Sequence, residues 1–279
     1  MTQKSIGIIG LGMVGYTIFN YYKDKGYVVR GWSPNHQLNS FNEVIECDYI
    51  FICVPTPFNW EKNNYNLSIL EETLDKINIK GKKVIIKSTI PPMTTDLLQT
   101  RYKNLLLFFN PEFLSEKTAK EDFSNPDRQI VGYTYKSFTS ALETLHLLPI
   151  SPYDVIMTST EAEICKYVNN FHGALMVIFA NLIYDICQKT NSNYERVKKA
   201  AQSSKWVGSP MGRMYWEVFH NGFRGYGGKC FPKDINILIK WCKKNKISME
   251  ILEATRKANR RILQNQELCE KKVEKISNR

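Results

Sequence analysis

The chain has 279 residues, of which 43% are hydrophobic and 12% aromatic, enough for two ordinary domains with cores of their own. Its formal net charge of +11 favours an anionic partner. The basic residues are scattered and densest near the C-terminus, so we expect a phosphate-bearing small molecule and no nucleic acid. A solvated basic surface without a partner is the alternative.

Cysteine usage and hydropathy indicate the compartment. The seven cysteines are an odd number without paired spacing, and no Cys/His cluster has the spacing of metal ligands. Met1 runs almost directly into an apolar strand, without a signal peptide, and no apolar run approaches the length of a membrane span. We therefore expect a reducing, cytoplasmic setting, no metal and no membrane partner.

The chain opens with a strand, a glycine-rich turn, a helix and a second strand. Residues 5–10 (SIGIIG) form the short apolar run of a buried parallel strand. Residues 16–25 are predicted to form a helix that ends at Gly26, and residues 27–32 (YVVRGW) a second strand. This order is that of a dinucleotide-binding unit.

The glycines of that turn have the spacing GxGxxG, with Gly10, Gly12 and Gly15. In this context the first glycine permits a tight turn, the second lets backbone approach a pyrophosphate, and the third lets the helix pack on the strand. The helix N-terminus then faces the phosphates. The turn therefore predicts a dinucleotide cofactor.

The end of the second strand departs from the usual pattern. An NAD site favours an acidic residue there, for the ribose hydroxyls, and this chain has Ser33. Ser33 or Asn35 can bond a ribose, whereas Arg30 and His36 beside a small residue fit a 2′-phosphate. NAD is the first expectation, and NADP stays open.

Apolar runs alternate with helical patterns as far as residue 158. Strands are predicted at residues 49–57, 83–90, 105–109, 129–133 and 154–158, with helices at 67–77 and 136–147. This alternation indicates an α/β fold with a Rossmann-type, parallel, doubly wound sheet. Ligands of such sheets bind beyond the carboxyl ends of the strands, where Gly10, Pro55, Thr89 and Glu112 fall.

The pattern then becomes all-helical. Helices are predicted at residues 161–190, 194–204, 235–245 and 249–275. We place an NAD-binding Rossmann-like domain at residues 1–157 and a helical central and dimerisation domain at residues 158–279.

The last predicted helix carries the apolar residues Ile251, Leu252, Ile262 and Leu263. Together they can pack against a symmetry mate, as in a homodimer.

The stretch GYGGKCFPKD at residues 225–234 places Cys230 between glycines and a Pro-Lys-Asp run. A thiol beside cationic groups can be held as the nucleophilic thiolate, although a lone cysteine is more often a buried small hydrophobe. On the long helix, Lys166 and Asn170 are spaced i and i+4 and can stabilise an oxyanion together. Such pairs are also common on solvated helix faces.

Seven motifs occur in one order over nearly the whole chain. They are GLGMVG (10–15), CVPTP (53–57), STIPPMTT (88–95), NPEFLSE (110–116), the spaced Asp122, Pro126, Arg128 and Gly132, EAEICKYVNN (161–170) and GYGGKCFPKD (225–234). In this order they resemble the UDP-glucose/GDP-mannose dehydrogenase family.

The resemblance implies a two-step, NAD-dependent oxidation of the 6-hydroxyl of a nucleotide sugar, with UDP-glucose the first candidate, and a product used in polysaccharide biosynthesis. Cys230 resembles the nucleophile that forms a thiohemiacetal and then a thioester. Lys166 and Asn170 resemble the oxyanion-stabilising pair, and Glu112 the residue linked to thioester hydrolysis. Thr89 and Asp234 resemble the residues that position the water, although Asp234 can equally cap the helix that it opens.

The resemblance also implies binding residues. For the cofactor they are Gly10, Gly12, Met13, Val14, Gly15, Ser33, Pro55, Thr56, Thr89 and Glu116. For the nucleotide sugar they are Phe113, Leu114, Lys166, Asn170, Tyr226, Gly227, Gly228 and Lys233.

Two departures from the family pattern bear on substrate binding. The family has a third, C-terminal domain, and we expect this chain to lack it. An aromatic stretch at residues 214–219 (MYWEVF) is either core or a replacement for part of a base-binding surface. The competing interpretations are a truncated, non-catalytic nucleotide-binding or regulatory relative, and a single-step β-hydroxyacid-type dehydrogenase on a two-domain plan.

Overall fold

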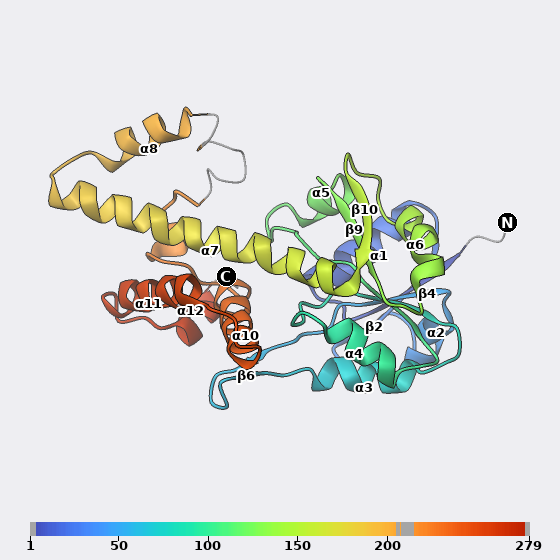
Figure 1. The fold of residues 1–279 in the computed structure, drawn as a ribbon. Helices are drawn as coiled ribbons and strands as arrows, with labels where there is room; N and C mark the ends of the chain where they lie inside the picture. The colour runs from blue at the N-terminus through green and yellow to red at the C-terminus, as the bar shows by residue number, and fades with distance from the viewer. Residues whose placement is uncertain (1–3, 205–206, 208–214, 277–279) are drawn as a thin grey trace. The chain divides into compact units, whose positions relative to one another are not determined.

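The computed structural model describes residues 4–204, 207 and 215–276 (Figure 1). The chain divides into two compact units, the first made of Met1–Asn59 and Tyr65–Lys166, the second of Trp60–Asn64 and Tyr167–Arg279. The division thus lies inside helix α7 (Ser159–Lys189), eight residues into it, whereas the sequence analysis placed it after residue 157.

The first unit is built on an eight-stranded sheet with the order β10-β9-β8-β7-β4-β1-β2-β3. Its strands are β1 (Ser5–Ile9), β2 (Val28–Ser33), β3 (His36–Gln37), β4 (Tyr49–Ile52), β7 (Lys83–Ile86), β8 (Leu106–Phe109), β9 (Gln129–Tyr133) and β10 (Asp154–Thr158). The five central strands, β2, β1, β4, β7 and β8, run parallel. The expected α/β fold with a doubly wound sheet is therefore confirmed.

Side chains alternate across this sheet and create two apolar layers. In β4, Ile50 and Ile52 belong to one core, and Tyr49 and Phe51 to the other. Burying each such side chain stabilises the fold by about 1.5–3 kcal/mol.

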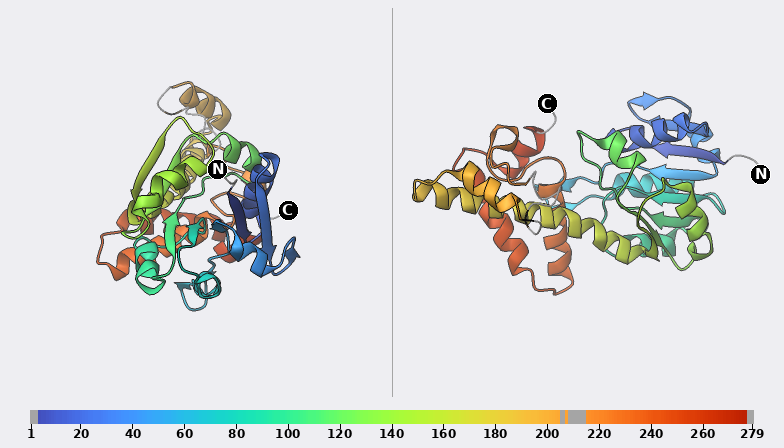
Figure 2. Two further views of the ribbon diagram at one scale, coloured as in Figure 1. Left: turned by 90° about the vertical axis from the view of Figure 1, so that its right-hand side faces the viewer. Right: turned by 90° about the horizontal axis from the view of Figure 1, so that it is seen from above.

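Helices cover both faces of the sheet (Figure 2). One face is covered by α2 (Phe41–Glu46), α3 (Ser68–Ile77), α4 (Thr94–Arg101) and the start of α7. The other is covered by α1 (Met13–Asp24), α5 (Ala119–Ser124) and α6 (Ala141–Leu147).

The alternation of elements predicted a sheet that is parallel throughout, and this prediction is wrong for one pair of strands. β9 runs antiparallel to β8, with Phe109 opposite Gly132, and β10 then runs parallel to β9. A parallel strand needs a crossover that carries the chain back across the sheet. The connection between β8 and β9 contains only the six-residue α5 and returns at the carboxyl end of β8.

The second unit is helical. Beside α7 it contains α8 (Tyr194–Gln202), the 3-10 turn η2 (His220–Gly222), α10 (Phe231–Lys244), α11 (Glu250–Gln264) and α12 (Glu270–Ile276). The short hairpin of β5 (Phe58–Asn59) and β6 (Asn64–Tyr65) contributes its tip, and Trp60 Nε1 donates to Glu274 Oε2 at 3.1 Å.

The aromatic stretch at residues 214–219 belongs largely to this core. Trp216 and Val218 are buried with Tyr194 and Cys187, whereas Phe219 is exposed. Met214 lies outside the described residues. The packing favours the interpretation of this stretch as core.

The prediction of a single helix at residues 249–275 is wrong, because the structure has two helices there. α11 ends at Gln264, the chain turns through Glu267 at φ +58°, and α12 begins at Glu270. The turn lets Val273 pack on Leu263 and Phe223. The expected dimer face is also wrong for Leu252 and Leu263, because these two side chains are buried inside the unit.

Helix α7 is long and apolar enough, by length and composition alone, to cross a membrane. This contradicts the expectation that no apolar run approaches that length. The core helix of a soluble protein passes the same test, and 33% of its apolar window is buried. Ala162 lies in a core of the first unit, and Ala174 and Ala180 in cores of the second.

Candidate functional site

The glycine turn after β1 has the geometry that a pyrophosphate needs. Gly10 has φ +98°, and a Cβ there would lie 2.5 Å from the Cys53 carbonyl oxygen. A Cβ on Gly15 would lie 1.9 Å from the Gly10 oxygen, so only glycine lets α1 start so close to the strand. A Cβ on Gly12 would meet nothing within 4 Å, and Gly12 caps α1 without a side-chain hydrogen bond. Open space beside uncapped N–H groups fits a phosphate.

Met13 and Val14 form the first turn of α1 behind these glycines, and Met13 is exposed. The residues of this turn therefore fit the phosphate portion of a dinucleotide.

The end of β2 is a tight hairpin. Ser33 Oγ accepts from the backbone N–H of His36 at 3.2 Å, and β3 pairs with β2 there. Arg30 lies within β2 and its guanidinium pairs with Glu43 at 2.8 Å. Arg30 is therefore committed to Glu43, which weakens the argument for a 2′-phosphate and leaves NAD favoured.

Two further cofactor residues follow β4. Pro55 is exposed, whereas Thr56 is buried and its Oγ1 donates to the Thr89 carbonyl at 2.7 Å. Thr89, half-buried after β7, is thus tied through its backbone to the segment after β4. The expected residues at the carboxyl ends of β4 and β7 lie side by side.

Glu112 lies in the segment that follows β8. Its backbone oxygen accepts from Lys166 Nζ at 2.5 Å, and its carboxylate lies 4.0 Å from the same ammonium. The other carboxylate oxygen accepts from the backbone N–H of Leu114. Glu112 and Lys166 are 12% and 6% exposed in their side chains, so this ion pair is screened little by water.

Two cations lie near the ring of Phe113. The Arg128 guanidinium lies 4.1 Å from its centroid and the Lys166 ammonium 5.7 Å. Such contacts orient both cations. Leu114 is half-buried and Glu116 is exposed. Of the residues expected in this segment, Glu112 is the one held by a buried charge.

Two buried ionisable groups of the first unit were missed from the sequence. Lys87 Nζ donates to Asn110 Oδ1 at 2.8 Å, and burial lowers the pKa of its ammonium to about 8. Glu163 accepts from the backbone N–H and the hydroxyl of Thr95, and burial raises the pKa of its carboxyl to about 8. Lys87 ends the apolar run KVIIK at the edge where ligands bind, which was the available signal.

Cys230 stands at the N-cap of α10 in the second unit, and its side chain is exposed. Its carbonyl accepts from the Asp234 N–H at 2.8 Å, and Pro232, which has no N–H, fills the first turn. N–H groups at a helix N-terminus stabilise an anion, so the position suits a thiolate. The alternative of a buried structural thiol does not hold here.

Asp234 is 1% exposed, and its two carboxylate oxygens have different donors. Asn170 Nδ2 donates to one oxygen and Lys233 Nζ to the other, each at 2.5 Å. The carboxylate therefore locks the first turn of α10 to α7. Asn170 lies one turn after Lys166 on α7, as the sequence predicted.

The glycine loop before Cys230 is fixed by hydrogen bonds to Asn259 of α11. Asn259 Oδ1 accepts from the Tyr226 N–H at 2.8 Å, and its Nδ2 donates to the Tyr226 oxygen. Gly225 and Gly228 have φ of +92° and +75°. A Cβ on Gly227 would meet the Phe223 ring at 2.6 Å. The Tyr226 ring is buried in a core of the second unit, and its role in substrate binding stays a prediction.

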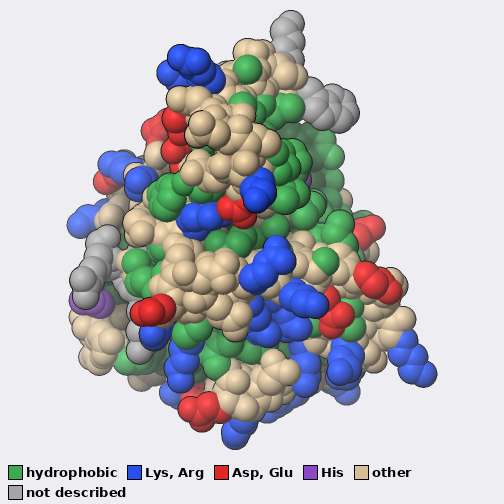
Figure 3. Space-filling model, turned by 90° about the vertical axis from the view of Figure 1, so that its left-hand side faces the viewer, with side chains coloured by type: hydrophobic (Ala, Val, Ile, Leu, Met, Phe, Trp, Pro, Cys, Tyr) green, Lys and Arg blue, Asp and Glu red, His purple; other side chains and the backbone are tan. Residues whose placement is uncertain are grey.

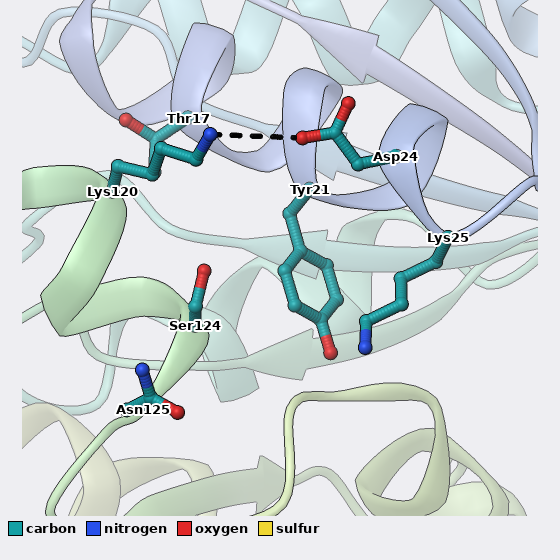
Figure 4. A pocket seen from close by; sticks show the side chains of 7 residues that line it. All are labelled: Thr17, Tyr21, Asp24, Lys25, Lys120, Ser124 and Asn125. Atoms are coloured by element: carbon teal, nitrogen blue, oxygen red, sulfur yellow. Dashed lines mark ion pairs between the residues drawn. The ribbon is translucent and has the colours of Figure 1, made fainter.

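Two surface hollows are lined by other residues. One, of about 340 Å³, lies between α1 and α5 in the first unit. Figure 4 shows its lining: Thr17, Tyr21, Asp24, Lys25, Lys120, Ser124 and Asn125. It contains none of the expected cofactor or substrate residues.

The other hollow, of about 330 Å³, is in the second unit and is lined by Asn63, Asn236, Ile239, Lys240, Lys243, Lys244, Glu253 and Arg256. Four cations face one carboxylate there. Figure 3 likewise shows a face of the molecule on which Lys and Arg outnumber Asp and Glu. Part of the net charge of +11 is thus concentrated rather than scattered.

Two family models match most of the chain. Residues 33–147 match the NAD binding domain of the UDP-glucose/GDP-mannose dehydrogenase family, and residues 160–261 match its central domain. The UDP-glucose 6-dehydrogenase of Rickettsia bellii is 32% identical over 231 residues, which are 79% of this chain and 51% of that protein. The chain spans about half the length of the curated relatives that it matches.

Solved structures agree with the fold. A UDP-glucose dehydrogenase from Pyrobaculum islandicum superposes with a TM-score of 0.79 and 26% identity, over 92% of this chain and 68% of that one. A Mycobacterium tuberculosis 3-hydroxyisobutyrate dehydrogenase superposes with a TM-score of 0.71 over 91% of both chains, at 15% identity. The latter likeness shows the fold alone.

Proposed function

Because the chain belongs to the UDP-glucose/GDP-mannose dehydrogenase family, we propose that it oxidises the 6-hydroxyl of a nucleotide sugar to a carboxylate, with UDP-glucose as the first candidate substrate. The observation that carries the proposal is the exposed Cys230 thiol at the start of α10, within the matched central domain. NAD, bound at the glycine turn, supplies the hydride acceptor. The product, a nucleotide uronate, is the kind of precursor that cytoplasmic polysaccharide synthesis consumes.

Cys230 acts in this proposal after the hydroxyl has become an aldehyde. Its sulfur adds to the aldehyde carbon, a C–S bond forms, and the carbonyl oxygen takes up a proton to give a thiohemiacetal. Transfer of a second hydride to a second NAD, with loss of that proton, gives a thioester. Water then attacks the same carbon, the C–S bond breaks, and the acid and the thiol are released. A covalent stage explains how two oxidations occur without release of aldehyde.

The remaining roles follow from charge. Lys166 and Asn170 are buried donors one turn apart, suited to stabilise the oxyanion of each tetrahedral state. Glu112 is the acceptor for a proton of the attacking water. Thr89 and Asp234 orient that water, and Asp234 also locks the turn that carries the thiol.

The test is a turnover screen of the purified chain with UDP- and GDP-sugars and either NAD or NADP, followed by absorbance of the reduced cofactor. We expect two reduced NAD per UDP-glucose and a slower reaction with GDP-mannose. Absence of turnover with every sugar of the panel would reject the proposal.

The second candidate is a non-catalytic nucleotide-binding relative. The observation that favours it is Ser33, which stands where an acidic residue would bind the cofactor ribose and whose Oγ instead accepts from the His36 N–H. Calorimetry separates the two candidates. Tight NAD binding by the chain that shows no turnover in the screen would favour the binding protein.

We further propose that the protein is a homodimer. On α7, Val168, Phe179, Leu182 and Ile186 are 63%, 44%, 55% and 49% exposed, and their spacing places them on one helix face. Such a stripe favours a second copy. Analytical ultracentrifugation should show a dimer that Leu182→Lys dissociates, and a monomer at high concentration would contradict it.

A further inference from the structure

Lys87 is a buried lysine for which the proposed reaction has no role. It follows β7, its side chain is almost fully buried, and the ring of Phe123 lies 5.8 Å from its ammonium. An ammonium removed from water destabilises a fold by several kcal/mol unless it is held by acceptors. Its acceptors are Asn110 Oδ1 at 2.8 Å and the Pro111 oxygen at 3.5 Å. Both belong to the segment that leads to Glu112.

Asn110 is fixed from three sides. Its backbone N–H donates to the Ile86 oxygen at 3.0 Å, and its side-chain amide donates to the Ile130 oxygen at 2.7 Å. Its remaining side-chain oxygen accepts from Lys87. Pro111 has no N–H, so the chain can be held at that residue only through its oxygen. Lys87 supplies a donor to both residues before Glu112.

Glu112 then lies between two buried lysines. Lys166 holds its backbone oxygen from α7, and Lys87 holds the two residues before it from β7. The charged and titratable groups around Lys87 are Glu112 and Lys166, together with the thiol of Cys53 after β4. Glu112 carries the one carboxyl group among them, and it is the group whose direction the reaction depends on.

We propose that Lys87 is a positioning residue for Glu112: its protonated ammonium fixes the Asn110 side chain and the Pro111–Glu112 peptide, and thereby the direction in which the Glu112 carboxylate receives a proton from water. The inference rests on the proposed function, because thioester hydrolysis is the step that Glu112 serves there. Neutral Lys87 keeps fewer donors and no charge, so hydrolysis slows once the ammonium loses its proton. Burial, which lowers the pKa of Lys87 to about 8, brings that loss into the working range.

The experiment compares Lys87→Met, Lys87→Arg and the control Lys83→Met in the intact chain. Lys83 lies at the opposite end of the same strand, where it pairs with Glu143 at 2.6 Å. Lys87→Met should lower kcat by about 100-fold, the effect of a misdirected catalytic group, with the KM for NAD unchanged within about 2-fold. Intact-protein mass spectrometry should show the covalent intermediate accumulating on Cys230. Lys83→Met should leave both kcat and the amount of covalent intermediate unchanged.

The pH profile separates positioning from a merely structural role. The wild-type kcat should fall as pH rises through about 8, the pKa of Lys87. An arginine stays charged far above that pH, so Lys87→Arg should retain turnover at pH 7.5 and move the fall upward by about one unit or more.

Each possible result supports or overturns the role of Lys87. Active wild type with unchanged kcat, intermediate and pH profile in Lys87→Met overturns this inference and leaves the proposed function standing. If circular dichroism shows that Lys87→Met does not fold, Lys87→Arg decides alone, and an unmoved high-pH fall overturns the inference. A wild-type chain without turnover overturns both proposals.

Discussion

The segment around Glu112 in the first unit and the turn around Cys230 in the second hold their functional groups in opposite ways. Glu112 is nearly buried and lies beside the ammonium of Lys166. Cys230 is exposed, and the buried charge lies one turn later in Asp234, which is locked by Asn170 and Lys233.

The difference follows from what each group must do. A carboxylate that accepts a proton must point in one direction, and buried partners fix that direction. A thiol that attacks carbon must reach its substrate, so only the backbone beneath it is fixed. Substitutions near Glu112 should therefore change stability and function together, whereas substitution of Cys230 should change function alone.

The largest effect is expected for Cys230→Ser. Loss of the nucleophile should reduce formation of the acid by about 10⁴-fold or more. The exposed position should leave the unfolding midpoint within about 2 °C of wild type. Cys269→Ser, at the other exposed cysteine, is the matched control and should keep full activity. Most activity surviving in Cys230→Ser would instead favour the single-step β-hydroxyacid-type reaction.

The next largest effect is a pH dependence of stability at Glu163. Its pKa in the fold, about 8, is raised above the ordinary 4.5 chiefly by burial. The stability that this group contributes is therefore fully present below pH 4.5 and is lost as pH rises through 8. Glu163→Gln keeps an acceptor for Thr95 and removes the titration.

Urea unfolding of both proteins measures this effect. The wild type should lose on the order of 3–5 kcal/mol relative to Glu163→Gln between pH 4.5 and 8. Glu161→Gln is the control, because Glu161 is exposed and its hydrogen bonds to Thr158 lower its pKa, so its smaller effect has the opposite sign. Parallel pH curves for wild type and Glu163→Gln would show that Glu163 does not titrate in this range.

The sequence predicts part of this fold and part of the candidate site. Apolar runs located β1, β4 and β8 within a few residues, because a strand buried on both faces is apolar throughout. The motif order indicated Cys230 and Asp234, whose roles stay predictions. The direction of β9 could not be predicted, since an apolar run records burial and not the edge at which a connection returns.

The features that the sequence did not reveal are short helices, buried ionisable groups and a break between two helices. The six-residue helices α2 and α5 are too short for a full amphipathic pattern. Lys87 and Glu163 look like surface residues in composition, and only their packing distinguishes them. The break between α11 and α12 depends on the left-handed Glu267, a conformation that glutamate rarely signals.

A smaller effect is expected at the glycine turn. Gly12→Ala should fold normally, because its Cβ meets nothing within 4 Å, but should weaken NAD binding about 10- to 100-fold by occupying the space for the pyrophosphate. Gly15→Ala is the contrast, since its Cβ would lie 1.9 Å from backbone and must displace α1. Calorimetry with NAD and thermal melting together separate the two. Unchanged NAD affinity in Gly12→Ala would place the cofactor elsewhere.

The smallest effect is expected for a lysine that is exposed. Lys120 lies 3.8 Å from Asp24, and the two side chains are 85% and 65% exposed, so the pair should contribute less than about 0.5 kcal/mol. Lys198, by contrast, is 9% exposed and lies 2.8 Å from both Glu195 and Glu217. Lys198→Met should destabilise the second unit by about 1–3 kcal/mol, and Lys120→Met should leave the urea midpoint unchanged. If the two variants lost the same stability, burial would not distinguish lysines that stabilise a segment from lysines that contribute only surface charge. Burial would then give no physical reason to expect that Lys87 fixes Glu112.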